Sequence, residues 1–179
     1  MALGSTVYNF DIDLADADRG VYETLALRVA RHASESEEFL LTRILAYALE
    51  FVPGLEFSAG LSTPDDPALW VRDETGAVSA WIEVGVPDAA RLHKAAKAAR
   101  RVAVYTHKDV TQWRARLAGE RIHRAAEIDV WAIDRGLLRD LGTCLERRTG
   151  FALSVADREL FISIGDRTLS GRVERYPLA

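Results

Sequence analysis

The chain has 179 residues, of which 49% are apolar and 28% charged, and its formal net charge at pH 7 is −4. This composition predicts one globular domain over residues 1–179, and the net charge excludes a protein that attracts nucleic acid through its overall charge. Cys144 is the only cysteine, which excludes an internal disulfide and a zinc site built on cysteines. No apolar stretch approaches the ~18 residues of a membrane span, and no secretory signal is present, so we expect a cytoplasmic protein without a membrane partner.

The N-terminal part of the chain predicts two paired strands. Polar and apolar residues alternate over residues 6–15 and again over residues 24–29, as they do in strands with one buried face. Turn-forming residues at positions 15–20 separate the two runs. We therefore expect an antiparallel strand pair.

A helix is predicted to begin at Ser34. Ser34 and Glu37 have the spacing of a capping box, in which each side chain binds the other residue's backbone N–H. Glu38 lies in line with the apolar stripe of this helix, so its carboxylate either belongs to a functional site or interacts favourably with the helix dipole. Glu35 and Glu37 are predicted to be solvated. The buried stripe itself is formed by apolar residues at helical spacing: Leu41, Ile44, Leu45 and Ala48.

A strand that ends at Glu83 organises the middle of the chain. A turn with two prolines and two acids leads into a strand at 69–72, and Thr75-Gly76 then reverses the chain into the apolar run at 80–84. The period of two places Trp81 and Glu83 on the same face of this second strand.

The chain beyond Glu83 alternates between helices and strands. Asp88 has the position of a helix N-cap, and the alternation up to Ile133 predicts parallel strands. The C-terminal part predicts a β-meander with turns near 157–158 and 165–166. The fold class is thus α/β, with a mixed central sheet and flanking helices. The predicted helices cover 89–99, 109–124 and 136–148, and the predicted strands 102–105 and 128–133.

Glu83 is the centre of the predicted functional site. Open α/β sheets bind ligands beyond the carboxyl ends of their strands, and here a carboxylate faces a helix that bears cations. This arrangement suits a metal ion and a phosphate. His107 follows a buried strand at the same edge.

The helix after Asp88 carries the predicted phosphate-binding side chains. Arg91, Lys94 and Arg101 recur at helical spacing, so we expect them to project together, with Lys97 and Arg100 beside them. The sharper interpretation is a row of cations along a DNA or RNA backbone, which would include His107. The simpler interpretation is a solvated helix face.

Motifs spread over nearly the whole chain resemble those of the YaeQ family. Members of that family are small bacterial proteins, and the resemblance implies that this chain has their PD-(D/E)XK (restriction-endonuclease-like) core. No single piece is specific to that family, but the set is. The matching residues are Thr6-Val7-Tyr8, Ala30-Arg31-His32 followed by Ser34-Glu35, Glu38 with Arg43, Gly60-Leu61-Ser62, Leu69-Trp70, Trp81-Ile82-Glu83 with Gly85, Pro87-Asp88, Lys94 and Tyr105-Thr106.

The resemblance implies a Mg²⁺- or Mn²⁺-dependent phosphodiesterase that acts on nucleic acid. Glu83 matches the second metal-binding acid of the nuclease superfamily, and Glu38 resembles its auxiliary helix acid. Lys94 takes the place of the lysine that usually stands two residues after that acid, where this chain has Gly85. The backbone carbonyl of Val84 would be a further metal ligand.

The first metal-binding acid of the family pattern is replaced in this chain. Pro-Asp precedes Leu-Trp in that pattern, whereas this chain has Pro67-Ala68, and Asp66 is the nearest acid of the same strand parity. Two functions therefore stay open. The first is the metal-dependent nuclease, with Glu83, Asp66 and Val84 as metal ligands. The second is a non-catalytic module on the same fold that binds nucleic acid or a partner protein.

Overall fold

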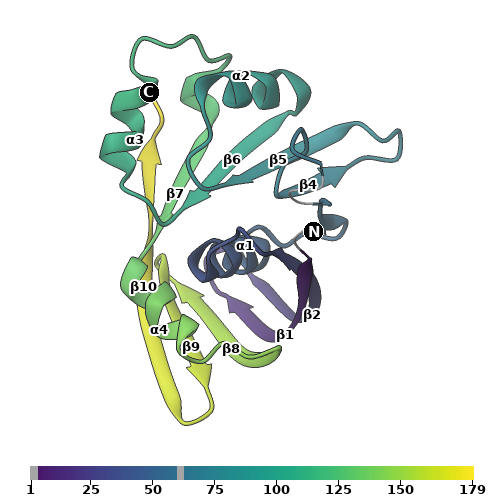
Figure 1. Cartoon of the computed structure of the whole chain (residues 1–179), viewed down its shortest axis with the longest axis vertical. Coiled ribbons are helices and arrows are strands. Elements are labelled where there is room, and N and C mark those ends of the chain that lie inside the picture. The colour runs from purple at the N-terminus through teal and green to yellow at the C-terminus, as the bar shows by residue number, and fades with distance from the viewer. Residues whose placement is uncertain (1–3, 60–62) are drawn as a thin grey trace. The chain divides into compact units, whose positions relative to one another are not determined.

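The computed structural model describes residues 4–59 and 63–179 as two compact units, which are treated separately below. One unit contains residues 1–51 and 133–173, and the other contains residues 52–132 and 174–179. Within the described residues there are ten strands and four α-helices, and the strands follow the hydrogen-bonded order β2-β1-β8-β9-β10-β7-β6-β5-β4-β3 (Figure 1). The predicted mixed α/β fold is confirmed, and the expectation of a single domain stays a prediction.

The first unit combines the N-terminal strand pair with the C-terminal meander. The pair is antiparallel, as predicted, and β1 also pairs in parallel with β8. Alternation along β1 buries Phe10, Ile12 and Leu14 on one face. The elements of this unit are β1 (Ser5–Asp16), β2 (Val21–His32), α1 (Glu37–Glu50), α4 (Arg135–Gly142), β8 (Arg148–Ala156), β9 (Glu159–Ile164) and most of β10 (Arg167–Pro177).

The predicted capping box of α1 is wrong. The N-cap is Ser36, whose hydroxyl accepts a hydrogen bond from the backbone N–H of Phe39 at 3.0 Å. Ser34 instead closes the turn after β2, with its Oγ 2.8 Å from Nδ1 of His32. Glu35, predicted to be solvated, is buried and forms an ion pair with Arg43 at 3.1 Å. A partner eight residues away along the chain thus overrides the local pattern.

The second unit contains the predicted parallel strands. β5 pairs in parallel with β6, and β6 with β7, which confirms the prediction from their alternation with helices. β4 is antiparallel to β5, and β3, which we did not predict, is antiparallel to β4. The elements are β3 (Leu55–Phe57), β4 (Leu69–Arg72), β5 (Val78–Val84), α2 (Ala89–Ala98), β6 (Arg101–Thr106), α3 (Val110–Leu117), the short 3₁₀ helix Ala125–Glu127 and β7 (Asp129–Ile133).

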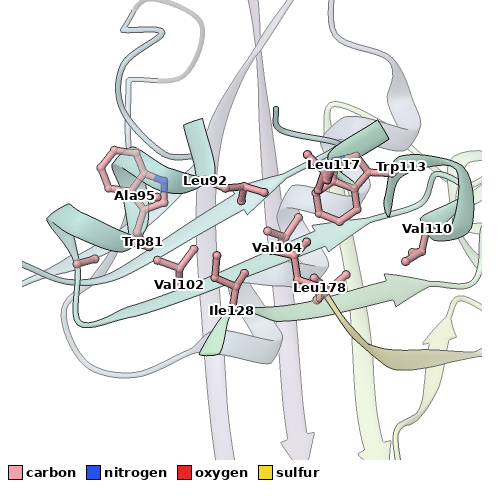
Figure 2. Packing of buried hydrophobic residues seen from close by; sticks show 13 residues of the cluster. Trp81, Leu92, Ala95, Val102, Val104, Val110, Trp113, Leu117, Ile128 and Leu178 are labelled. Carbon is pink, nitrogen blue, oxygen red and sulfur yellow. The ribbon is translucent and has the colours of Figure 1, made fainter. Parts of the chain in front are cut away.

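Helices α2 and α3 cover the same face of these parallel strands. Figure 2 shows Leu92 of α2 and Trp113 of α3 packed over Val102, Val104 and neighbouring residues. The indole Nε1–H of Trp113 also donates to the carbonyl of Pro87 at 2.8 Å, directly before the N-cap of α2. This hydrogen bond links α3 to the residue that precedes the N-cap of α2.

Two predicted helices end earlier than their sequence pattern indicated. α3 ends at Leu117 instead of residue 124, because Gly119 has a φ of +82° and the chain leaves the helix there. α4 ends at Gly142 instead of residue 148, and β8 begins at Arg148. No helix in the described ranges is long and apolar enough to cross a membrane.

Replacement of Trp113 tests whether this packing stabilises the second unit. We expect Trp113→Ala to lower the free energy of unfolding by about 3–5 kcal/mol, because it leaves a large cavity. Trp113→Phe keeps most of the ring but leaves the Pro87 carbonyl without its donor, at a cost of about 1–3 kcal/mol. Urea denaturation followed by circular dichroism measures both. Trp70→Phe, at a half-buried tryptophan, is the control, with an expected change within about 1 kcal/mol.

Candidate functional site

Glu83 lies at the carboxyl end of β5, a strand with neighbours on both sides. Its side chain is on the same face as Trp81, as the period of two predicted, and this is the face that α2 and α3 cover. Glu83 is only 4% exposed. A buried carboxylate requires a hydrogen-bond donor or a cation, so its partners determine what this site can do.

Two donors bind the same oxygen of Glu83. The Nε1–H of Trp81 and the Nε–H of Arg91 each donate to Oε1 at 2.7 Å. Within the described residues no hydrogen bond reaches Oε2. Burial raises the pKa of Glu83 above its ordinary value of 4.5, while the hydrogen bond from Trp81 and the positive charge and hydrogen bond of Arg91 oppose that rise. Arg91 thus stabilises the ionised form of Glu83.

Arg91 also ties α2 to the turn that precedes β4. Its two terminal nitrogens donate to the backbone carbonyls of Pro64 and, at 2.6 Å, of Asp66. One turn further along α2, Lys94 forms an ion pair with Asp65 at 3.1 Å. The Lys94 pair is exposed and weak, whereas the guanidinium of Arg91 joins a buried carboxylate to two carbonyls.

Ala68 directly precedes β4, in which Leu69 pairs with Ile82, the residue before Glu83. Its side chain has no carboxylate, so position 68 adds no second acid near the end of β5 where Glu83 lies.

The metal ligands expected from the resemblance are Glu83, Asp66 and Val84, and their role stays a prediction. Among the described residues, no group of three or more histidine, cysteine, aspartate or glutamate side chains is arranged to hold a metal ion. Asp66 precedes Ala68 by two residues in the chain. Its backbone carbonyl accepts a hydrogen bond from Arg91. Val84 is the last residue of β5. Mg²⁺ requires six oxygen ligands in near-ideal geometry, and the cation bound to Glu83 here is an arginine.

Gly85 stands two residues after Glu83, in a backbone conformation that disfavours a side chain. Its φ is +103°, a conformation that L side chains rarely adopt, and its N–H donates to the carbonyl of Tyr105 at 2.9 Å. The chain turns there toward Asp88, whose carboxylate caps α2 as predicted by accepting from the N–H of Arg91 at 2.8 Å.

The predicted row of three cations on one helix is wrong. α2 ends at Ala98, and Arg101 is the first residue of β6, where it forms an ion pair with Asp129 at 3.4 Å. Arg91 is turned toward Glu83, whereas Lys97 is exposed on α2. His107 is 3% exposed and therefore does not present its ring at the surface.

Glu38 belongs to the other unit, where it lies in the first turn of α1. Its carboxylate pairs with Arg135 of α4 at 3.5 Å. The Gly60-Leu61-Ser62 stretch of the family resemblance lies outside the described residues. The residue whose role the sequence did not reveal is Arg91, because the strand–turn–helix geometry that brings it back to Glu83 is not visible in a helical period.

Comparisons with known proteins agree over nearly the whole chain. The family model described as YaeQ protein matches residues 1–173. The uncharacterized protein YaeQ of Salmonella typhi is 32% identical over 168 residues, which cover 91% of each chain. The protein of the same name in Escherichia coli (strain K12) is 30% identical over 166 residues, again 91% of each.

Two solved structures have the same fold. The YaeQ protein from Xanthomonas axonopodis pv. citri matches with a TM-score of 0.87 and 32% identity, over 96% of this chain and 97% of that one. The YaeQ protein from Pseudomonas syringae matches with a TM-score of 0.86 and 30% identity, over 96% and 95% of the two chains.

Removal of Arg91 should destabilise the protein in a pH-dependent way. Arg91→Met leaves Glu83 buried without its cation, so we expect the free energy of unfolding to fall by about 1–3 kcal/mol near pH 8. The pKa of Glu83 then rises further in the folded state. Because the folded state binds the proton more tightly, the loss relative to wild type should shrink as the pH is lowered to about 5. Urea denaturation at the two pH values measures it.

The double variant Glu83→Gln/Arg91→Met is the control for that measurement. It lacks the titrating carboxylate, so its stability relative to wild type should lack the extra pH dependence. An Arg91→Met variant with the same deficit at both pH values would show that Glu83 does not depend on Arg91 for its charge.

Proposed function

This chain belongs to the YaeQ family, and we propose that it is a nucleic-acid-binding protein that keeps a PD-(D/E)XK nuclease-like core without using it for hydrolysis. The observation that carries the proposal is the ion pair of Glu83 with Arg91. In this interpretation a guanidinium occupies the place of a divalent cation at the acid that matches the nuclease motif.

Charge and geometry both support a non-catalytic site. A divalent cation is held best by several anionic oxygens, and here one buried carboxylate is already balanced by one arginine. Ala68 stands where the family pattern has an acid, so that carboxylate is missing from this chain. The guanidinium is also held by the carbonyls of Pro64 and Asp66, so a metal ion would have to break three hydrogen bonds to displace it.

Nucleic-acid binding does not need the metal. Phosphate contacts from lysine and arginine provide most of the affinity in sequence-independent binding. Lys94 of α2 is exposed one turn after Arg91, and Lys97 is exposed further along the same helix, which supports nucleic acid as the partner class over a purely protein-binding role.

One observation favours a second candidate, the Mg²⁺- or Mn²⁺-dependent phosphodiesterase. Both donors bind Oε1 of Glu83, so in the described structure Oε2 keeps its lone pairs for another cation. In such an enzyme Lys94 would stabilise the charge of the bound phosphate, with Asp66 as a further acid. This function requires the segment with Pro64 and Asp66, together with Arg91, to move away from Glu83.

Restoring the missing acid separates the two candidates. We expect isothermal titration calorimetry to detect no Mn²⁺ binding to the wild type, and a duplex incubated with Mn²⁺ to stay intact. Ala68→Asp combined with Arg91→Gln restores a pair of carboxylates and removes the competing guanidinium, so this variant should bind Mn²⁺. Ala68→Asn combined with Arg91→Gln has the same shape without the charge and should not bind.

Two results would decide against the proposal. If the wild type cleaves the duplex with Mn²⁺ and Glu83→Gln does not, the protein is the metal-dependent phosphodiesterase. If the wild type binds neither Mn²⁺ nor nucleic acid at low salt, it is a module for a protein partner.

A further inference from the structure

Positive charge is concentrated in one segment of this acidic protein. Residues 89–126 contain ten of the 23 lysine and arginine residues and only two of the 27 acids. The segment comprises α2, β6, α3 and the loop that follows α3, all within the second unit. The protein has a net charge of −4 and yet contains a strongly basic region, which the net charge of the whole chain does not show.

Four of these ten cations have acidic partners. Arg91 pairs with Glu83, Lys94 with Asp65, Arg101 with Asp129, and Arg124 with Glu127. For the other six, no acid lies within ion-pair distance among the described residues. We call these six the basic face: Lys97, Arg100, Lys108, Arg114, Arg116 and Arg121.

The fold turns the basic face outward. α2 and α3 bury Leu92 and Trp113 against the same side of the sheet (Figure 2), so their exposed sides point away from that sheet in the same general direction. Lys97 of α2 and Arg116 of α3 are both exposed. The two helices are thus able to present their cations to a single large ligand.

The loop after α3 is fastened to the end of α2. Arg124 donates to the carbonyls of Ala96 at 2.6 Å and Ala99 at 2.7 Å, where the negative end of the helix dipole lies. The N–H of His123 donates to Nδ1 of His93 at 3.1 Å. These contacts hold the residues that directly follow Arg121 against α2, the helix that carries Lys97.

We propose that the basic face is a binding site for the phosphate backbone of duplex nucleic acid, separate from the Glu83 site. This inference deepens the proposed function and rests on it. Cations that repel one another without acidic partners are stabilised by a polyanion, and release of its counterions favours binding. The site does not involve Glu83 or Arg91, so it serves the protein whether or not that carboxylate ever binds a metal.

The surface chemistry favours a duplex over a single strand. Single-strand sites add aromatic platforms on which bases stack. The large hydrophobic side chains that are exposed in the described residues are Tyr22, Val52 and Phe161, and none of them belongs to the basic segment. Five of the six basic-face side chains are exposed, and four of the six are arginines, which bind phosphate with two parallel hydrogen bonds.

The salt dependence of duplex binding tests the proposal. We expect Lys97→Gln/Arg116→Gln to lower the slope of log K against log salt concentration by about 1.8, since each lost phosphate contact removes about 0.9 for a duplex. Arg28→Gln/Arg139→Gln is the matched control, because it removes two exposed cations of the other unit and changes the net charge equally. Fluorescence anisotropy with a labelled random-sequence duplex, titrated at several KCl concentrations, measures the slope.

The outcomes distinguish this inference from the proposed function. If the wild type binds the duplex and the two double variants have equal slopes, the basic face is not the binding site. The proposed function then still stands. No binding by the wild type overturns both. Poly-glutamate of matched charge is the competitor: if it displaces the duplex as well as unlabelled duplex does, the surface accepts an acidic protein instead. A drop confined to Lys97→Gln/Arg116→Gln, with poor competition by poly-glutamate, supports the proposal.

Discussion

The ion pair between Glu83 and Arg91 is the constraint on which the site depends. A carboxylate that is 4% exposed loses its hydration, and burial alone would push it toward the protonated form. Arg91 offsets that cost and, with the same guanidinium, binds the carbonyls of Pro64 and Asp66. One side chain thereby connects β5, α2 and the turn before β4. Any ligand that needs Glu83 must first compete with this cation.

The ion pair with Arg91 limits the chemistry that Glu83 can perform in this chain. A shared fold can serve many functions, so the function has to be argued from the site. Here Ala68 has no carboxylate, the positive φ of Gly85 disfavours a residue with a side chain at that position, and Arg91 balances the charge of Glu83. The lysines and arginines of the second unit then form two sets. One set forms ion pairs with acids, and the other is the basic face, whose positive charges are suited to binding phosphate groups.

The alternation along β5 and the start of α2 could be predicted from the sequence, because both depend on residues that are close together in the chain. The period of two correctly placed Trp81 and Glu83 on one face, and Asp88 is the N-cap that its position predicted. Ser34 failed as a cap because the turn after β2 uses its hydroxyl, and Glu35 failed as a solvated acid because Arg43 reaches it in the interior. Both errors arose where partners outside the local pattern decided the outcome.

The sequence by itself determined the mixed α/β class, the parallel strands β5, β6 and β7, the resemblance to the YaeQ family and the start of α2 at Asp88. These follow from periodicity, turn chemistry and local motifs. Only the tertiary structure decided which cation binds Glu83, and that Arg101 belongs to β6 instead of the helix before it. Such facts depend on strand register and on where a helix ends, and both are set by packing between segments distant in the chain.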